Sequence, residues 1–193
     1  MNAREEILAR LRAALSDQPE PVQIPRRYAI SRTADLPALF TDRLVDYRAH
    51  VHQDLASALS GVDRLLVPAD IPRSWLDRFS ATVVVDEGLD VAALDRVDAV
   101  LTGCAVAIAE TGTIVLDAGA GQGRRAITLV PDRHVVVVRR EQIVSRVPEA
   151  VRFLAGSATR PQTWISGPSA TSDIELNRIE GVHGPRRLDV VLV

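Results

Sequence analysis

The chain has 193 residues, of which 47% are hydrophobic and 25% are charged, so its composition is that of one compact folded domain. All 23 basic residues are arginine, and the missing lysine excludes Schiff-base enzymes, pyridoxal-phosphate enzymes and P-loop NTPases, each of which needs a lysine amine. A net charge of −2 without a basic stripe disfavours nucleic-acid binding, and the single cysteine, Cys104, excludes a disulfide framework or an iron-sulfur cluster held by this chain alone.

Residues 1–60 are predicted to form a helical N-terminal arm. Apolar residues at helical spacing indicate a helix over residues 2–15, and Asn2 and Glu5 have the spacing of a capping box at its start. The next stretch, residues 16–30, contains three prolines and is expected to be an extended linker.

A second helix is predicted to begin near Pro37 and to run to about Leu59, just before Gly61. His50 and His52 would both lie on this helix. Because residues two apart on a helix face different directions, we expect these histidines to be surface residues without a shared metal.

Residues 61–193 are predicted to form an α/β core. Short β-branched or aliphatic runs alternate with helical patterns, which is typical of a parallel sheet. The expected strands are residues 65–67, 82–85, 99–101, 106–109, 114–116, 135–138, 164–166 and 188–193. The expected helices are residues 72–79, 91–94 and 141–154. The predicted fold class is therefore α/β, with an open, mostly parallel, Rossmann-like sheet flanked by helices.

The same composition also allows predictions about metal binding, a membrane span and the cellular location. Four histidines without a close cysteine disfavour a structural zinc site, and no apolar run approaches the roughly 18 residues of a membrane span. We therefore predict that the chain itself binds no metal and no cofactor, has no membrane span and is cytoplasmic.

The first candidate site segment lies between two predicted strands and consists of Glu110, Thr111, Gly112 and Thr113. Open α/β sheets place their sites at strand ends, so Glu110 is a candidate general base or nucleophile and its neighbours are candidate ligand contacts. A polar turn in which glycine supplies an unusual backbone angle explains the segment equally well.

The second candidate segment is rich in glycine and ends in two arginines. Gly121, Gln122 and Gly123 would bring backbone amides close to a ligand, and Arg124 and Arg125 suit bidentate contacts with a carboxylate or phosphate. The glycine spacing is not that of a dinucleotide-binding fingerprint. A surface turn with solvated arginines is the alternative.

The third candidate segment follows a predicted strand and carries amides and hydroxyls suited to an anion. The ligand-binding candidates in it are Ser166, Gly167, Ser169 and Thr171. Ser172 and Glu175 have capping-box spacing, so the segment is expected to open a helix, and simple capping explains it as well as anion binding does.

Two further histidines lie near these segments. His183 lies in a glycine-bounded loop before the last strand and is a candidate catalytic residue. His134 introduces a strand, and a structural role is favoured for it.

Together, the segments resemble the lactate-utilisation protein C family in order and spacing. The matching stretches are residues 109–113, 121–125, 131–138, 166–175 and 181–186. The resemblance implies a fold similar to the sugar-phosphate isomerase and CoA-transferase superfamily. It also implies two iron-sulfur partner proteins, which hold the clusters and with which the chain supports oxidation of L-lactate to pyruvate.

Two functions from different classes are compatible with this resemblance. In the first, the chain is a subunit that binds a small carboxylate or phosphate-bearing ligand, or docks its partners, with Arg124 and Arg125 as the anion clamp. In the second, it is an enzyme in its own right, similar to CoA transferases, in which Glu110 attacks an acyl-CoA to give a thioester. The first requires the three segments to converge on one cleft, whereas a purely structural role for them does not. The oligomeric state stays open.

Overall fold

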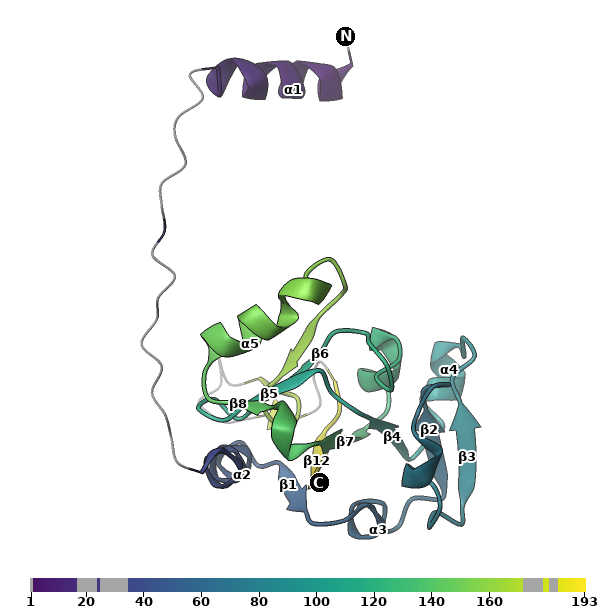
Figure 1. Ribbon diagram of the computed structural model, residues 1–193. Coiled ribbons are helices and arrows are strands. Elements are labelled where there is room, and N and C mark those ends of the chain that lie inside the picture. The colour runs from purple at the N-terminus through teal and green to yellow at the C-terminus, as the bar shows by residue number, and fades with distance from the viewer. Residues whose placement is uncertain (1, 17–23, 25–34, 172–178, 181–183) are drawn as a thin grey trace.

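The computed structural model describes residues 2–16, 24, 35–171, 179–180 and 184–193 (Figure 1). Within these residues the strands form a six-stranded sheet, a four-stranded sheet and a two-stranded ribbon, and helices flank the sheets. The parallel central sheet with its flanking helices confirms the predicted α/β fold class. None of the helices in the described ranges has the length and apolar character that crossing a membrane would require.

The central sheet has the strand order β1-β12-β7-β4-β2-β3, and every neighbouring pair is parallel. Its strands are β1 (His50–His52), β12 (Arg187–Leu192), β7 (Arg133–Val138), β4 (Ala99–Thr102), β2 (Arg64–Val67) and β3 (Thr82–Val85). The inner strands β12, β7, β4 and β2 are almost entirely buried, as continuous apolar runs covered on both faces should be. Because all strands run the same way, their carboxyl ends meet at one edge of the sheet and their amino ends at the other.

A second sheet, in the order β8-β5-β6-β9, packs on one face of the first. It consists of β8 (Ile143–Val144), β5 (Val106–Ile108), β6 (Thr113–Leu116) and β9 (Thr163–Ile165). The sequence correctly located three of these strands but wrongly assigned them to the same parallel sheet. The physical reason is the short turn between β5 and β6, because a connection of that length can join only antiparallel strands.

Helices and the second sheet cover the central sheet in layers (Figure 1). The helix α2 (Leu36–Asp46) and the second sheet pack on one face of the central sheet, through an apolar cluster that includes Phe40, Leu44, Ile114 and Val136. The short helices α3 (Leu55–Ala58) and η1 (Arg73–Trp75) border a cluster on the opposite face. The helix α5 (Val147–Phe153) covers the outer face of the second sheet.

The predicted second helix from Pro37 to about Leu59 is wrong, because the chain there forms α2, β1 and α3 in turn. After α2 the chain turns at Arg48, which has a φ of +62°, and β1 then pairs with β12 at the edge of the sheet. His50 and His52 consequently lie on a strand, where residues two apart share a face. Residues 36–58 therefore belong to the α/β body, and the predicted boundary at residue 60 does not separate an arm from it.

The first helix, α1 (Ala3–Ala14), begins as predicted. The Asn2 side chain accepts a hydrogen bond from the amide of Glu5, and the Glu5 carboxylate accepts one from the amide of Asn2. This reciprocal capping confirms the start of the helix. Its residues Ile7 and Leu11 are more than half exposed.

The predicted helix over residues 141–154 is also wrong over its first half. That stretch contains η3 (Arg140–Gln142) and β8, and α5 begins only at Val147. Pro148 accounts for the difference, because proline is tolerated in the first turn of a helix but disrupts its interior. The remaining short elements are α4 (Val91–Leu94), η2 (Arg125–Thr128), η4 (Leu154–Ser157), β10 (Ala170–Thr171) and β11 (Ile179–Glu180).

Candidate functional site

A cavity of about 220 Å³ lies between the two sheets, near the amino ends of β7 and β12. Its walls are formed by η2, by the first residues of β7 and β12, by β9, and by residues 166–168 and 184–185. A smaller hollow of about 160 Å³ shares Arg125, Thr128 and Thr163 with it. Two of the three predicted site segments therefore meet at this Arg125 cavity.

Arg124 and Arg125, which the sequence suggests as a clamp, have different environments. The guanidinium of Arg124 makes a bidentate contact with Asp86, with Nε to Oδ2 at 2.7 Å and Nη2 to Oδ1 at 2.9 Å, and also donates to the carbonyl of Leu89. The hydrogen bond with Arg124 lowers the pKa of Asp86, although partial burial opposes the shift. Arg125 lines the cavity, is exposed and has no acidic partner among the described residues. Arg125 is therefore the arginine that an anion can reach.

A chain of hydroxyl groups connects the first and third predicted segments. The hydroxyl oxygens of Thr111 and Thr113 are 2.7 Å apart, and that of Thr113 is 2.8 Å from the hydroxyl oxygen of Ser166. Gly112 makes this turn possible because it has a φ of +59°, and a Cβ there would lie 2.9 Å from the Cβ of Arg43 on α2. The turn is thus packed against α2, and its two threonines support the position of Ser166 at the cavity.

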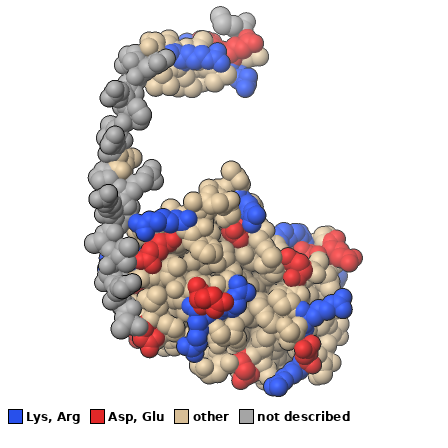
Figure 2. Space-filling model, viewed as in Figure 1, with Lys and Arg blue, Asp and Glu red and all other residues tan. Residues whose placement is uncertain are grey.

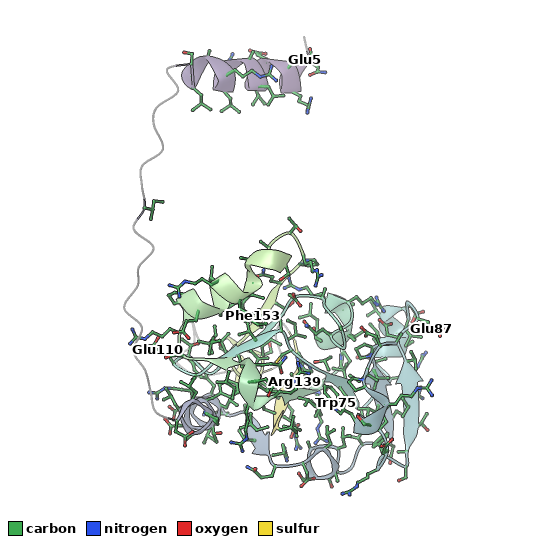
Figure 3. All side chains as sticks on the ribbon, in the orientation of Figure 1. Glu5, Trp75, Glu87, Glu110, Arg139 and Phe153 are labelled. Carbon is green, nitrogen blue, oxygen red and sulfur yellow. The ribbon has the colours of Figure 1, made fainter. Side chains whose placement is uncertain are left out.

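Glu110 does not line the Arg125 cavity. Its side chain is half exposed, with Oε1 at 3.3 Å from Nε of Arg146, and its amide donates to the carbonyl of Ser145. In Figure 3 it lies near the α2 side of the body, well apart from Trp75 and Arg139. A general base or nucleophile works best when neighbours shield it from water, so the role of Glu110 in catalysis stays a prediction.

The glycine-rich segment is held by its own glutamine. Gln122 is buried and makes two hydrogen bonds with Asp117, accepting from its amide at 2.6 Å and donating to Oδ1 at 3.0 Å. Gly123 lines the smaller hollow, whereas Gly121 lines a different cavity at the carboxyl edge of the central sheet. The segment therefore contributes to more than one cavity, and only Arg125 brings it to the first.

His134 forms part of the cavity wall, although the sequence favoured a purely structural role. It is fully buried, and its Nε2 lies 2.8 Å from the hydroxyl oxygen of Thr102. Burial lowers the pKa of His134 to about 4, so its imidazole is neutral near pH 7. A neutral ring can hydrogen-bond to a ligand or to Thr102 without placing a second positive charge beside Arg125.

The other predicted residues occupy the rim or lie elsewhere. Gly167 is buried in the cavity wall, and the amide of Ser169 donates to the carbonyl of Pro185 at 2.8 Å, which joins the two rim segments. Thr171 belongs to β10, which pairs with β11. His183 lies outside the described residues, as do Ser172 and Glu175 of the expected helix start.

Sequence reasoning missed the residues that complete the cavity. Thr128, Trp164 and Pro185 all line it, and none of them was among the candidate site residues. Thr128 belongs to η2, Trp164 to β9 and Pro185 to the segment before β12, so the cavity brings together stretches that are far apart in the chain. Among the residues that line the cavity, Arg125, Ser166 and Gly167 were candidates from the sequence.

Fold and site together define an α/β protein with a small cavity, open to solvent, in which one arginine has no acidic partner within the part of the chain that the structure describes. The model of the LUD domain family matches residues 72–193, and the chain belongs to this family. This match, together with the relatives described next, confirms the predicted lactate-utilisation protein C family.

Related proteins support this assignment. Lactate utilization protein C of Deinococcus radiodurans is 51% identical over 185 residues, which are 91% of this chain and 85% of the relative. Lactate utilization protein C of Halalkalibacterium halodurans is 35% identical over 105 residues, which are 51% of this chain and 45% of the relative. The crystal structure of a DUF162 family protein from Deinococcus radiodurans superposes with a TM-score of 0.73 at 48% identity, covering 86% of this chain and 99% of that one.

Proposed function

We propose that this chain is the cluster-free subunit of a lactate-utilisation system and that it binds a small carboxylate at the Arg125 cavity. Its relatives are called lactate utilization protein C, which supports the pathway. In this proposal the chain acts with two iron-sulfur proteins in the oxidation of L-lactate to pyruvate. The two electrons released would pass to the clusters of those partners, since a chain with one cysteine cannot ligate a cluster alone.

The observation that carries the proposal is the position of Arg125. Arg125 is exposed and lines a cavity together with Ser166 and Gly167, and it has no acidic partner among the described residues. A planar guanidinium can pair with both oxygens of a carboxylate, and the hydroxyl of Ser166 can donate a further hydrogen bond. Lactate and pyruvate are both small carboxylates, and a cavity of about 220 Å³ suits a ligand of that class.

Calorimetric titration of the full chain with L-lactate and with pyruvate tests this proposal. The Arg125→Ala substitution should weaken binding of the carboxylate by about 1.5 to 3 kcal/mol, the range for hydrogen bonds to charged groups. This corresponds to a rise of roughly 10- to 150-fold in Kd. Arg152→Ala, which removes an exposed arginine on α5, is the matched control and should leave Kd unchanged. If neither acid binds the intact chain, or if Arg125→Ala binds both as well as the intact chain does, carboxylate binding at this cavity is ruled out.

A further inference from the structure

A separate cavity of about 170 Å³ lies at the carboxyl edge of the central sheet and shares no lining residue with the Arg125 cavity. Asp70 follows β2 in the chain, Gly103 and Cys104 follow β4, and Arg139 follows β7, and all of these residues line it. We call it the carboxyl-edge cavity.

The strand order makes this edge a natural place for a ligand. The chain passes from β2 to β3 on one side and then returns to β4 on the other side of β2. At such a reversal the connections leave in opposite directions and open a crevice outside the carboxyl ends, where ligands bind in open parallel sheets. The carboxyl-edge cavity lies beside the ends of β2 and β4, so it occupies this crevice.

The walls of the carboxyl-edge cavity are held in place by the glycine-rich segment and by an indole ring. The amide of Gly121 donates to Oδ2 of Asp70 at 3.0 Å, and its carbonyl accepts from the amide of Gly103 at 2.8 Å. The ring of Trp75 packs over Gly103, where a Cβ would lie 3.4 Å from the Cη2 atom. Trp75 and Arg139 lie near each other in Figure 3, and both line the carboxyl-edge cavity.

Three polar groups of the carboxyl-edge cavity are available to a ligand. Arg139 forms an ion pair through Nε with Glu141 at 2.9 Å, and its terminal nitrogens have no hydrogen-bond partner among the described residues. Within the same described ranges, Oδ1 of Asp70 and Nε1 of Trp75 also form no hydrogen bond. The carboxyl-edge cavity thus offers a cation, an anionic acceptor and an indole that has both an N–H donor and an aromatic face.

We propose that the carboxyl-edge cavity binds a small organic anion that carries hydroxyl groups, with Arg139 on its anionic group and Asp70 on a hydroxyl. An anion without a hydroxyl would place its charge near Asp70 and give that carboxylate no donor in return. The face of Trp75 would pack against the carbon skeleton of the ligand. This site is independent of the Arg125 cavity and of the function proposed for it.

Cys104 does not add covalent chemistry to this site. Burial raises the pKa of its thiol to about 12, although the charge of Arg139 acts in the opposite direction. Near neutral pH the sulfur is therefore a protonated thiol, which is a poor nucleophile. The role proposed for the carboxyl-edge cavity is therefore binding.

Calorimetric titration with four small probes tests both halves of the recognition. D-glycerate carries a carboxylate and hydroxyls, propionate has the carboxylate alone, glycerol has the hydroxyls alone, and glycerol 3-phosphate replaces the carboxylate by a phosphate. We expect glycerate, glycerol 3-phosphate or both to bind at least tenfold more tightly than propionate and glycerol. The stronger of the two identifies the preferred anionic group. If none of the four binds, or if propionate matches both hydroxylated anions, the inference is overturned.

Variants of the full chain locate the binding. Arg139→Gln should weaken binding of the preferred hydroxylated anion at least tenfold, and Asp70→Asn should remove the preference over propionate. Arg140→Gln is the matched control, because Arg140 is the exposed neighbour of Arg139 and does not line the carboxyl-edge cavity. Unchanged binding in Arg139→Gln would overturn the inference.

Arg125→Ala separates this inference from the proposed function. It should leave binding of the hydroxylated anion at the carboxyl edge intact. If Arg125→Ala abolishes that binding and Arg139→Gln does not, the probe occupies the first cavity and only the second site is refuted. If Arg139→Gln alone abolishes it, the second site stands whatever happens to lactate binding.

Discussion

The two faces of the central sheet differ at the amino ends of β7 and β12. Alternate residues of these strands point to opposite faces, so Arg133 and Asp189 lie on one face and His134 and Leu188 on the other. On the first face the carboxylate of Asp189 is completely buried and hydrogen-bonded by Arg133, Arg187 and His52. On the second face His134 and Leu188 line the cavity of Arg125.

This difference shows that an arginine paired with a buried carboxylate stabilises the fold, whereas an arginine without such a partner is available to a ligand. Arg133 also donates to the carbonyls of Ala58 and Ser60, so the ion cluster fastens α3 to the sheet. Across the visible surface, arginine and acidic side chains are interspersed (Figure 2). The environment of each arginine therefore has to be judged individually.

The largest effect is expected from Asp189→Asn. Burial alone would raise the pKa of Asp189, but the hydrogen bonds from Arg187, Arg133 and His52 outweigh it and lower that pKa. Removing the charge leaves the nearly buried Arg133 without its counter-ion. Breaking such a pair lowers the free energy of unfolding by about 3 to 5 kcal/mol. Urea unfolding at pH 7 measures this loss.

The control for that substitution is Asp132→Asn. Asp132 pairs with Arg186, and both side chains are well exposed, so water replaces the lost contact. We expect a much smaller loss of stability than in Asp189→Asn. Equal losses in the two variants would contradict the structural role of the buried cluster.

The second prediction concerns the pH dependence caused by His134 on the cavity face. Its folded-state pKa of about 4 lies below the ordinary value of 6.5, so between these pH values the unfolded chain binds more protons. Stability from this residue is therefore complete above pH 6.5 and is lost as the pH falls toward 4, by up to about 3 kcal/mol. The contribution of Asp189 is lost only below its ordinary pKa of 3.8, so the two windows are separate.

Urea unfolding between pH 4 and 7 measures this slope. In His134→Gln the slope should be markedly flatter, because the buried titrating group is gone. His50→Gln removes an exposed histidine and should keep the slope of the intact chain. A His134→Gln variant with the original slope would refute the assignment.

The smallest expected effect is the difference in unfolding free energy between variants of the adjacent Arg124 and Arg125. Arg124→Ala should lower the free energy of unfolding by about 1 kcal/mol, because its pair with Asp86 is bidentate but partly exposed to water. Arg125→Ala should change it by no more than about 0.5 kcal/mol, as is usual for surface substitutions. Thermal unfolding of the two variants measures both values. A larger loss in Arg125→Ala than in Arg124→Ala would reverse the comparison.

The strands of the parallel sheet were well predicted, and their arrangement was not. Predicted strands 82–85 and 135–138 lie within β3 and β7, because β-branched runs signal strands locally. The strand at His50–His52 was missed, since its pattern is too short and only pairing with β12 stabilises it. Assignment to one sheet or the other depends on which strands pair, and pairing is not a local property.

The candidate site was predictable to a similar extent. Arg125 and Ser166, which were candidates because their residue types suit an anion, line the same cavity, and their role in binding stays a prediction. The sequence could not indicate that Glu110 lies outside that cavity or that Gly121 faces the carboxyl edge instead. Turns of similar composition lead to either edge of a sheet.

The sequence by itself determined which residue types are available. A chain without lysine and with one cysteine has arginine as its only strong cation, and its apolar runs specify buried strands. Only the tertiary structure decided which arginine is neutralised, because Asp86 reaches Arg124 from 38 positions away in the chain. Arg124 and Arg125 are adjacent in the chain and share the same local sequence. The electrostatic energy of each charge depends instead on the groups that lie within a few ångströms of it.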